Sequence, residues 1–354
     1  MKNLFKSFLL AFVVLAFFAN LKAEEISFNT GSYAEVIKKA KTEHKIIMAD
    51  FYTDWCIWCR QLDMKVYTDP TIADYANKNQ VNWKTDAEKG EGIDLAKKYK
   101  ITGYPTLVFI DGDGNEVDRI VGYFPAADFY GVMKGITDGS MTVSKLKKAL
   151  SKKGDDVKVN YDLSQRYEAL GMGKDAAVLF NKIIKKDPFN KAGYTDDAEL
   201  QLAIDKDDAA AVKTLLAKYP STNMKKDATV YLFNKSQEDG NEEVTMNYIN
   251  DLLTNYGTDE MVRFYIGQFY SSKAQKVMKD PNATDDMRRE ALANADKSLE
   301  YLTGGIFEAS PNNVKSELYY QLKDKDNALV YVDKALSIWD KKVYREQKDK
   351  IEKL

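Results

Sequence analysis

The sequence has few of the residues that build metal centres or disulfide frameworks. Its 354 residues include two cysteines, one histidine and seven prolines. A disulfide-stapled scaffold needs several cysteine pairs, and a structural zinc site needs four cysteine or histidine ligands. We therefore expect no metal and no bound cofactor. The formal net charge of -2 likewise gives no reason to expect nucleic acid as a partner.

The two cysteines lie together in the segment Cys56-Ile57-Trp58-Cys59. With two residues between them, one thiolate can attack a foreign disulfide while the other resolves the mixed disulfide that forms. Thiol–disulfide exchange is therefore the leading interpretation, and it requires a pair that solvent can reach. A permanently oxidised, purely structural pair is the alternative.

The first residues have the pattern of a secretory signal. Lys2 and Lys6 precede an apolar run over residues 8–18, which is shorter than the roughly 20 residues of a membrane-spanning helix. The small residue Ala23 follows, just before two glutamates. We expect residues 1–23 to be removed and the protein to be exported, periplasmic or extracellular, and soluble after cleavage. An uncleaved membrane anchor is the alternative.

Short apolar runs alternate with amphipathic segments from residue 24 to about residue 139. This alternation, followed by a hairpin, predicts an α/β domain with a mixed central sheet and helices on its faces. Thr53-Asp54 is expected to cap the helix that begins at the cysteines. The expected strands cover residues 45–52, 81–85, 106–110 and 116–121, and the expected helices cover residues 56 to about 67, 93–99 and 124–136.

Two segments of this domain resemble the active-site segments of thioredoxins. Residues 49–60, ADFYTDWCIWCR, are similar to the segment with the paired cysteines, and residues 103–109, GYPTLVF, to the one with the cis-proline. Gly122 fits the glycine that follows the last strand. The Trp-Cys-x-Trp-Cys form is similar to exported and periplasmic thioredoxin-like proteins, including the C-terminal domain of transmembrane thiol:disulfide interchange proteins. The resemblance implies a thioredoxin-like fold and thiol–disulfide oxidoreductase activity.

The resemblance also implies roles around the cysteines. Cys56, at a helix N-terminus whose unpaired N–H groups favour a thiolate, is expected to attack, and Cys59 to resolve the mixed disulfide. Asp50, six positions before Cys56, is expected to be buried and to relay the proton of Cys59. The lysine that often accompanies this aspartate aligns with Asn82, with Lys84 two residues on. A solvated Asp50 at the strand end is the alternative, and burial decides between the two.

Five further residues are expected to meet the substrate. Trp55 and Trp58 flank the attacking cysteine, and Trp55 is expected to border the substrate groove. Pro105 is expected to follow a cis peptide bond, which would turn the Tyr104 carbonyl and the Thr106 N–H towards an extended substrate strand. A core position for Trp55 and a trans proline at an edge strand are the alternatives.

Strand signals fade beyond about residue 140. Leu163, Tyr167, Ala176, Phe180 and Pro188 match the spacing of a tetratricopeptide repeat of about 34 residues. A second set near the end echoes this spacing and comprises Ser316, Tyr319, Ala328, Val332 and Ala335. We expect residues 140–354 to form an all-α, tetratricopeptide-like domain. Such a domain either binds a client or partner or serves only as scaffold.

The combined prediction is an exported thiol–disulfide oxidoreductase that reduces protein disulfides through its Cys-x-x-Cys dithiol. Its partners would be a protein disulfide substrate and an upstream thiol donor or electron-transfer protein, with a further protein partner on the helical domain. Two alternatives stay open. One is a chaperone or interaction module in which the repeat domain is primary, and the other is a disulfide isomerase or oxidase.

Overall fold

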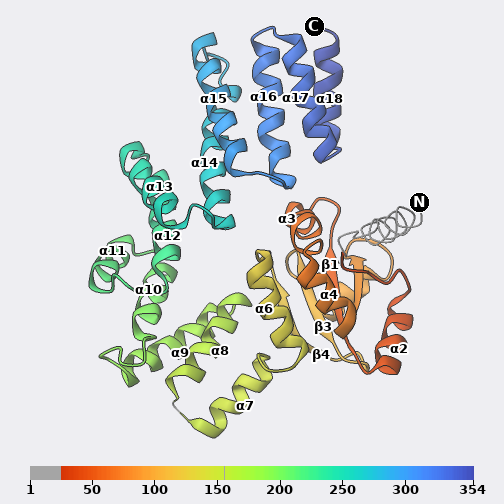
Figure 1. Ribbon diagram of the computed structural model, residues 1–354, viewed down its shortest axis with the longest axis vertical. Coiled ribbons are helices and arrows are strands. Elements are labelled where there is room, and N and C mark those ends of the chain that lie inside the picture. Colours follow the sequence, from red (N-terminus) through yellow and green to blue (C-terminus); the bar gives the residue numbers. More distant parts are fainter. Residues whose placement is uncertain (1–24, 155) are drawn as a thin grey trace, which may run out of the picture. The chain divides into compact units, whose positions relative to one another are not determined.

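The computed structural model describes residues 25–154 and 156–354. The chain divides into two compact units, Met1–Asp138 and Gly139–Leu354 (Figure 1). The expected signal, residues 1–23, lies outside the described residues. Within the described ranges, every helix is too short or too polar to span a lipid bilayer.

The first unit is built on a four-stranded mixed sheet, as the sequence predicted. Its strand order is β2-β1-β3-β4. Strand β1 (Ile46–Tyr52) pairs in parallel with β2 (Gln80–Asp86) and antiparallel with β3 (Thr106–Ile110), and β3 pairs antiparallel with β4 (Glu116–Val121). The five central residues of β1 are all buried. Burial on both faces explains why β1 is apolar at nearly every position, with Asp50 as the exception, rather than alternating.

Helices cover both faces of this sheet (Figure 1). They are α2 (Tyr33–Glu43), α3 (Ile57–Gln61), α4 (Pro70–Asn79), α5 (Gly92–Lys98) and α6 (Ala126–Thr137), and a π-helical turn, Leu62–Val66, continues α3. Two of these helices, α2 and α4, were not expected from the sequence. Pro70 is the first residue of α4, where a proline loses no helical hydrogen bond, and Asp69 caps the start.

Alternate residues of β1 point to opposite faces of the sheet. Ile47, Ala49 and Phe51 pack with α2 and α5, whereas Met48 packs with the side chains of α4 and α6. Because side chains alternate along a strand, Asp50 lies on the same face as Met48. Leu107, its neighbour across the β1–β3 ladder, belongs to the Met48 cluster as well. Asp50 is therefore on the face that α6 and the segment after the cysteines cover.

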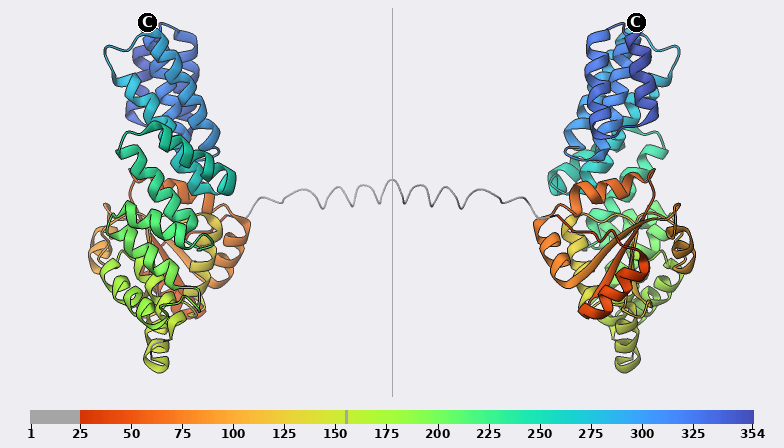
Figure 2. Two further views of the ribbon diagram at one scale, coloured as in Figure 1. Left: turned by 90° about the vertical axis from the view of Figure 1, so that its left-hand side faces the viewer. Right: turned by 90° about the vertical axis from the view of Figure 1, so that its right-hand side faces the viewer.

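The second unit is all-α in its described residues, as predicted, and consists of successive antiparallel helices (Figure 2). The pairs α8–α9, α12–α13, α14–α15 and α16–α17 lie side by side. The helices are α7 (Val143–Lys153), α8 (Val157–Ala169), α9 (Gly173–Lys186), α10 (Thr195–Asp205), α11 (Ala209–Lys218), α12 (Lys225–Glu238), α13 (Glu242–Tyr256), α14 (Glu260–Lys279), α15 (Asp285–Tyr301), α16 (Ala309–Gln321), α17 (Lys325–Ile338) and α18 (Lys342–Glu352).

Most of the residues that carried the repeat spacing are core residues of these pairs, whereas Pro188 is exposed just after α9. Leu163, Tyr167, Ala176 and Phe180 form one cluster between α8 and α9. At the other end of the unit, the buried Ser316 hydroxyl of α16 donates to the Ala328 carbonyl of α17 at 2.9 Å. The small residues Ser316 and Ala328 thus lie where α16 and α17 approach closely.

At Gly267, α14 lies close to the end of α15. A Cβ added at Gly267 would lie 2.5 Å from Cγ of Leu302, which is buried. At Gly131, in the middle of α6, an added Cβ would meet nothing within 4 Å. The two glycines therefore form a matched pair for testing the packing.

We predict that Gly267→Ala destabilises the second unit by about 1–3 kcal/mol through overpacking. Gly131→Ala should instead stabilise the first unit by roughly 0.5–1 kcal/mol, because alanine has the higher helix propensity. Urea unfolding of both variants, followed by circular dichroism, measures these changes. Equal stabilisation by both substitutions would contradict the close helix approach.

Candidate active site

The two cysteines form a disulfide at the start of a helix. Their sulfur atoms are 2.11 Å apart, and Cys56 is the N-cap of α3. The Cys59 N–H donates to the Cys56 sulfur at 3.0 Å. The expected cap, Thr53-Asp54, was therefore wrong, because the extended backbone of Cys56 lets its own sulfur take the capping position. In the reduced protein this donor and the helix N-terminus favour a thiolate at Cys56.

The disulfide is nearly covered. Cys56 is 4% exposed and Cys59 is 2% exposed. A pair at an open, solvent-reachable edge was expected, so the structure leaves a narrower approach than the sequence suggested. Of the two residues, Cys56 is slightly the more exposed.

Asp50 is fully buried, with none of its surface exposed. The Tyr67 hydroxyl donates to its Oδ2 at 3.0 Å, and the Lys84 Nζ lies 3.5 Å from the same oxygen. Lys84 also pairs with Asp63, which is about half exposed. The alternative of a solvated aspartate at the strand end is therefore wrong.

Lys84, and not Asn82, lies opposite this aspartate. The parallel register of β1 and β2 pairs Asp50 with Lys84 and Met48 with Asn82. An alignment that is wrong by two positions keeps the same face of the strand, so the sequence pattern alone could not reveal the error. The lysine expected from the resemblance is thus present, two residues beyond the expected position.

The surroundings of Asp50 act on its charge in opposite directions. Burial raises the pKa of the Asp50 carboxyl, the positive charge of Lys84 lowers it and the charge of Asp63 raises it again, with a net pKa above the ordinary value. Burial by itself would lower the pKa of Lys84, but Asp50 and Asp63 raise it overall. Lys84 therefore stays protonated, while Asp50 is poised to hold or release a proton nearer neutral pH than an exposed aspartate does.

Two aromatic pairs accompany the disulfide. Trp55 is 61% exposed, so a core position is excluded, and its ring edge packs against Tyr104 at 5.8 Å between centroids. Its Nε1 donates to the Glu88 carboxylate at 3.1 and 3.2 Å. Trp58 packs against Tyr123 at 5.1 Å. Both tryptophans are thus held by contacts from other loops, and Trp55 presents a large surface next to Cys56.

The Tyr104–Pro105 peptide bond is cis, as the resemblance implied. The Pro105 carbonyl accepts from the Gly122 N–H at 2.8 Å, and the Thr106 hydroxyl donates to the Gly103 carbonyl at 2.8 Å. Thr106 is the first residue of β3 and is buried. The proline segment is therefore tied to the end of β4, beside the tyrosine that contacts Trp55.

Four site residues were missed in the sequence: Asp63, Tyr67, Glu88 and Tyr123. A signal for two of them existed, since Cys59, Asp63 and Tyr67 follow at intervals of four residues, which places them on one face of a helix. Glu88 and Tyr123 lie in loops that approach the site only in the folded chain, and no local pattern indicates them.

Comparison with known proteins also identifies the first unit as thioredoxin-like. The model of a thioredoxin-like domain matches residues 33–137. The disulfide bond reductase DsbH of Chlamydia pneumoniae is 30% identical over 129 residues, which are 34% of this chain and 70% of DsbH. This chain belongs to the thioredoxin-like family. The thiol:disulfide interchange protein DsbD of Yersinia pestis is 32% identical over 93 residues, but the match spans 25% of this chain and only 16% of DsbD.

Solved structures are similar to each unit separately. A putative disulphide-isomerase from Bacteroides thetaiotaomicron is 41% identical, with a TM-score of 0.31, over 32% of this chain and 95% of that one. YrrB, described as a TPR protein with an unusual peptide-binding site, is 16% identical with a TM-score of 0.37, over 59% of this chain and 99% of that one.

The raised pKa of Asp50 predicts a pH-dependent gain of stability in Asp50→Asn. At pH values below the ordinary aspartate pKa, about 3.9, the folded and unfolded states both hold the proton. As the pH rises towards the higher pKa of the folded state, Asp50 ionises first in the unfolded chain. This favours the unfolded state and lowers the free energy of unfolding of the wild type. The variant lacks this penalty, so its stability relative to wild type should increase from about pH 4 upward.

Urea unfolding of the oxidised protein between pH 4 and 8 measures this difference. Tryptophan fluorescence is a suitable signal, because Trp55, Trp58 and Trp83 lie in the first unit and only Trp339 lies outside it. The exposed Asp94→Asn is the control for replacing one aspartate of this unit by asparagine. A pH-independent difference between Asp50→Asn and the wild type would refute the raised pKa.

Proposed function

We propose that this protein is an exported thiol–disulfide oxidoreductase that reduces protein disulfides. The Cys56 thiolate attacks a substrate disulfide, forms a mixed disulfide and releases one substrate thiolate. Cys59 then attacks the Cys56 sulfur, which closes the Cys56–Cys59 disulfide and releases the second substrate thiolate. Two electrons pass from the dithiol to the substrate. The observation that carries the proposal is the disulfide at a helix start in a member of the thioredoxin-like family.

Asp50 is the proposed proton acceptor for the second step. Cys59 must lose its proton before it can attack the mixed disulfide. A buried carboxyl whose pKa lies above the ordinary value takes up a proton more readily near neutral pH than an exposed one. Trp55, Trp58, Tyr104, Pro105 and Thr106 are proposed to bind the polypeptide around the substrate disulfide.

The reducing direction is supported by similarity to a protein named a disulfide bond reductase. An upstream thiol donor or electron-transfer protein would then regenerate the dithiol. Isomerase activity is the second candidate, because the similar structure from Bacteroides thetaiotaomicron is named a putative disulphide-isomerase. Export rests on the charged and apolar pattern of residues 1–23.

We predict that Cys59→Ser traps the substrate. In this variant Cys56 can still attack, but the mixed disulfide has no resolving thiol, so multiple turnover should be lost while a single attack survives. Non-reducing electrophoresis after incubation with a disulfide-containing protein such as insulin measures the adduct. Cys56→Ser is the matched control and should form little or none. If neither variant forms an adduct with insulin or with proteins of the exporting cell, the proposed enzyme activity fails.

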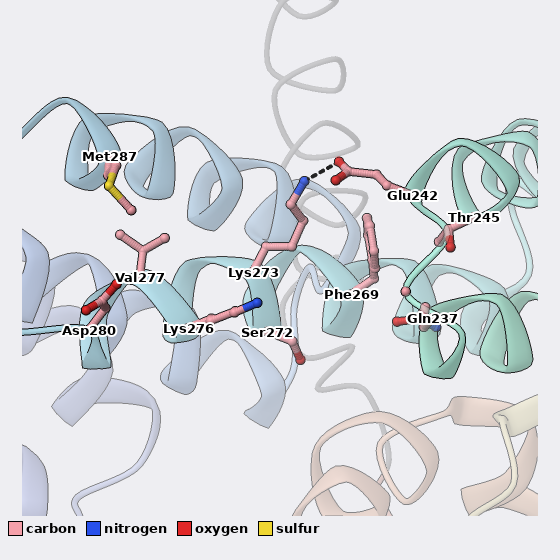
Figure 3. A pocket seen from close by; sticks show the side chains of 11 residues that line it. Gln237, Glu242, Thr245, Phe269, Ser272, Lys273, Lys276, Val277, Asp280 and Met287 are labelled. Atoms are coloured by element: carbon pink, nitrogen blue, oxygen red, sulfur yellow. Dashed lines mark hydrogen bonds and ion pairs between the residues drawn. The ribbon is translucent and has the colours of Figure 1, made fainter. Parts of the chain in front are cut away.

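The second unit carries a groove suited to a polypeptide partner (Figure 3). Its volume is about 490 Å³. It is lined by one face of α14 and its C-cap Asp280, by the end of α12 and the start of α13, and by Met287 of α15. Phe269, Val277 and Met287 supply apolar surface, and Figure 3 shows Val277 and Met287 facing one another. A cleft of this composition can accept apolar side chains of an extended or helical segment.

The two lysines of the groove differ in their pairing. Lys273 is paired with Glu242 at 2.5 Å, whereas Lys276, one turn along α14, is exposed and makes no ion pair with any residue that the structure describes. We therefore propose that the partner segment places an acidic side chain near Lys276 and an apolar side chain against Val277 and Met287. The partner would be a client or an associated protein, which corresponds to the interaction role of the helical unit.

We predict that Lys276→Glu weakens binding of an acidic, leucine-containing peptide by about fivefold or more, because an exposed ion pair contributes up to about 1 kcal/mol and the reversed charge adds repulsion. Fluorescence anisotropy of a labelled peptide with alternating glutamate and leucine measures the affinity. Lys279→Glu, on the same helix but outside the groove, is the control for overall charge. Equal affinity of the peptide for both variants and the wild type would refute the groove.

A further inference from the structure

The two oxygens of the Asp50 carboxyl have different surroundings. Oδ2 accepts the Tyr67 hydroxyl at 3.0 Å and is the oxygen that Lys84 faces at 3.5 Å. Oδ1 is buried and accepts no hydrogen bond from any residue in the described part of the chain. A buried polar oxygen without a partner is costly, and a role in a reaction is one explanation for keeping such an atom. Oδ2 is thus occupied by two partners, whereas Oδ1 is available to accept a proton.

The tyrosine that holds Oδ2 is itself fixed in place. Tyr67 ends the π-helical turn, and its carbonyl accepts from the Ile26 N–H at 2.8 Å. Its buried ring packs between Phe28, at 5.1 Å, and Phe129, at 6.2 Å. Burial and the neighbouring Asp50 carboxylate raise the pKa of Tyr67 well above its ordinary value, so the phenol keeps its proton and acts only as a donor.

The charged groups around Asp50 come from two other elements. Lys84 faces it from β2, and Asp63 lies behind Lys84 in the π-helical turn. From β3, the neighbour of Asp50 is the apolar Leu107. Both Lys84 and Tyr67 therefore act on Oδ2, and neither competes for a proton at Oδ1.

We propose that Tyr67 is a positioning residue that holds Oδ2 of Asp50, so that Oδ1 is the oxygen that takes the proton of Cys59. This inference rests on the proposed oxidoreductase function. The S–H proton of Cys59 passes to Oδ1, and the freed electron pair attacks the Cys56 sulfur. The Cys56–substrate bond breaks, and the leaving substrate thiolate is protonated by solvent.

The test separates attack from resolution in Tyr67→Phe, which removes one oxygen and keeps the ring. The prereduced enzyme reacts with excess of a fluorescently labelled disulfide peptide between pH 5 and 9, and rapid quenching separates the first step from the second. Attack should change less than about twofold. Resolution should slow by roughly tenfold or more at neutral pH, the usual scale for a lost hydrogen bond to a charged group.

The pH profile distinguishes positioning from a structural role. A lost donor disfavours the ionised carboxylate, so the midpoint of the resolution step should move to higher pH in Tyr67→Phe. Tyr130→Phe, whose ring contacts Tyr75 on another part of this unit, should leave the midpoint unchanged. In an Asp50→Asn background Tyr67→Phe should have no further effect on resolution. An unchanged midpoint and rate in folded Tyr67→Phe would overturn the inference.

Two outcomes keep this inference separate from the proposed function. If the wild-type enzyme forms no mixed disulfide, the oxidoreductase proposal fails and this inference fails with it. If Asp50→Asn slows resolution but Tyr67→Phe does not, only the role of Tyr67 fails. Should Tyr67→Phe not fold, Phe129→Leu loosens the packing of the Tyr67 ring and should shift the midpoint in the same direction by a smaller amount. An unchanged profile in that variant would count against the role of Tyr67.

Discussion

The burial of the Asp50 carboxylate is the constraint around which the first unit is organised. A buried charge costs several kcal/mol unless it is paired and hydrogen-bonded. Here the β1–β2 register supplies Lys84, the turn after the cysteines supplies Tyr67, and Asp63 gives Lys84 a second partner. A fold that needed only stability would place an apolar residue at this position. The buried carboxylate is therefore the group to which we assign the proposed proton transfer.

The helical stretch after Cys56 connects this cluster to the disulfide. Cys59, Asp63 and Tyr67 follow at intervals of four residues along Ile57–Val66 and its C-cap. One short element thus carries a sulfur at its start and the groups that control a buried carboxyl at its end. One segment therefore carries both Cys59 and the tyrosine that contacts Asp50, which suits the proton transfer that we propose between them.

The second unit carries the groove that we propose as the site of a protein partner. Its paired helices bury small and aromatic residues between them, and the groove on α14 combines apolar side chains with an exposed lysine. A thioredoxin-like domain that binds its substrate mainly through the backbone near the disulfide has little sequence selectivity. If the second unit bound the partner, it would supply that selectivity.

The sequence by itself determined the α/β character of the first unit, the mixed sheet, the all-α second unit and the cysteine pair. These features depend on local patterns, namely apolar runs, turn residues and the spacing of Cys56 and Cys59. It did not reveal α4, because a proline that ends one helix can also begin the next. Only the tertiary structure decided that Lys84 rather than Asn82 meets Asp50, and that Glu88 and Tyr123 belong to the site. Strand register and long-range side-chain contacts are settled by packing across the whole unit, and a linear pattern does not encode them separately.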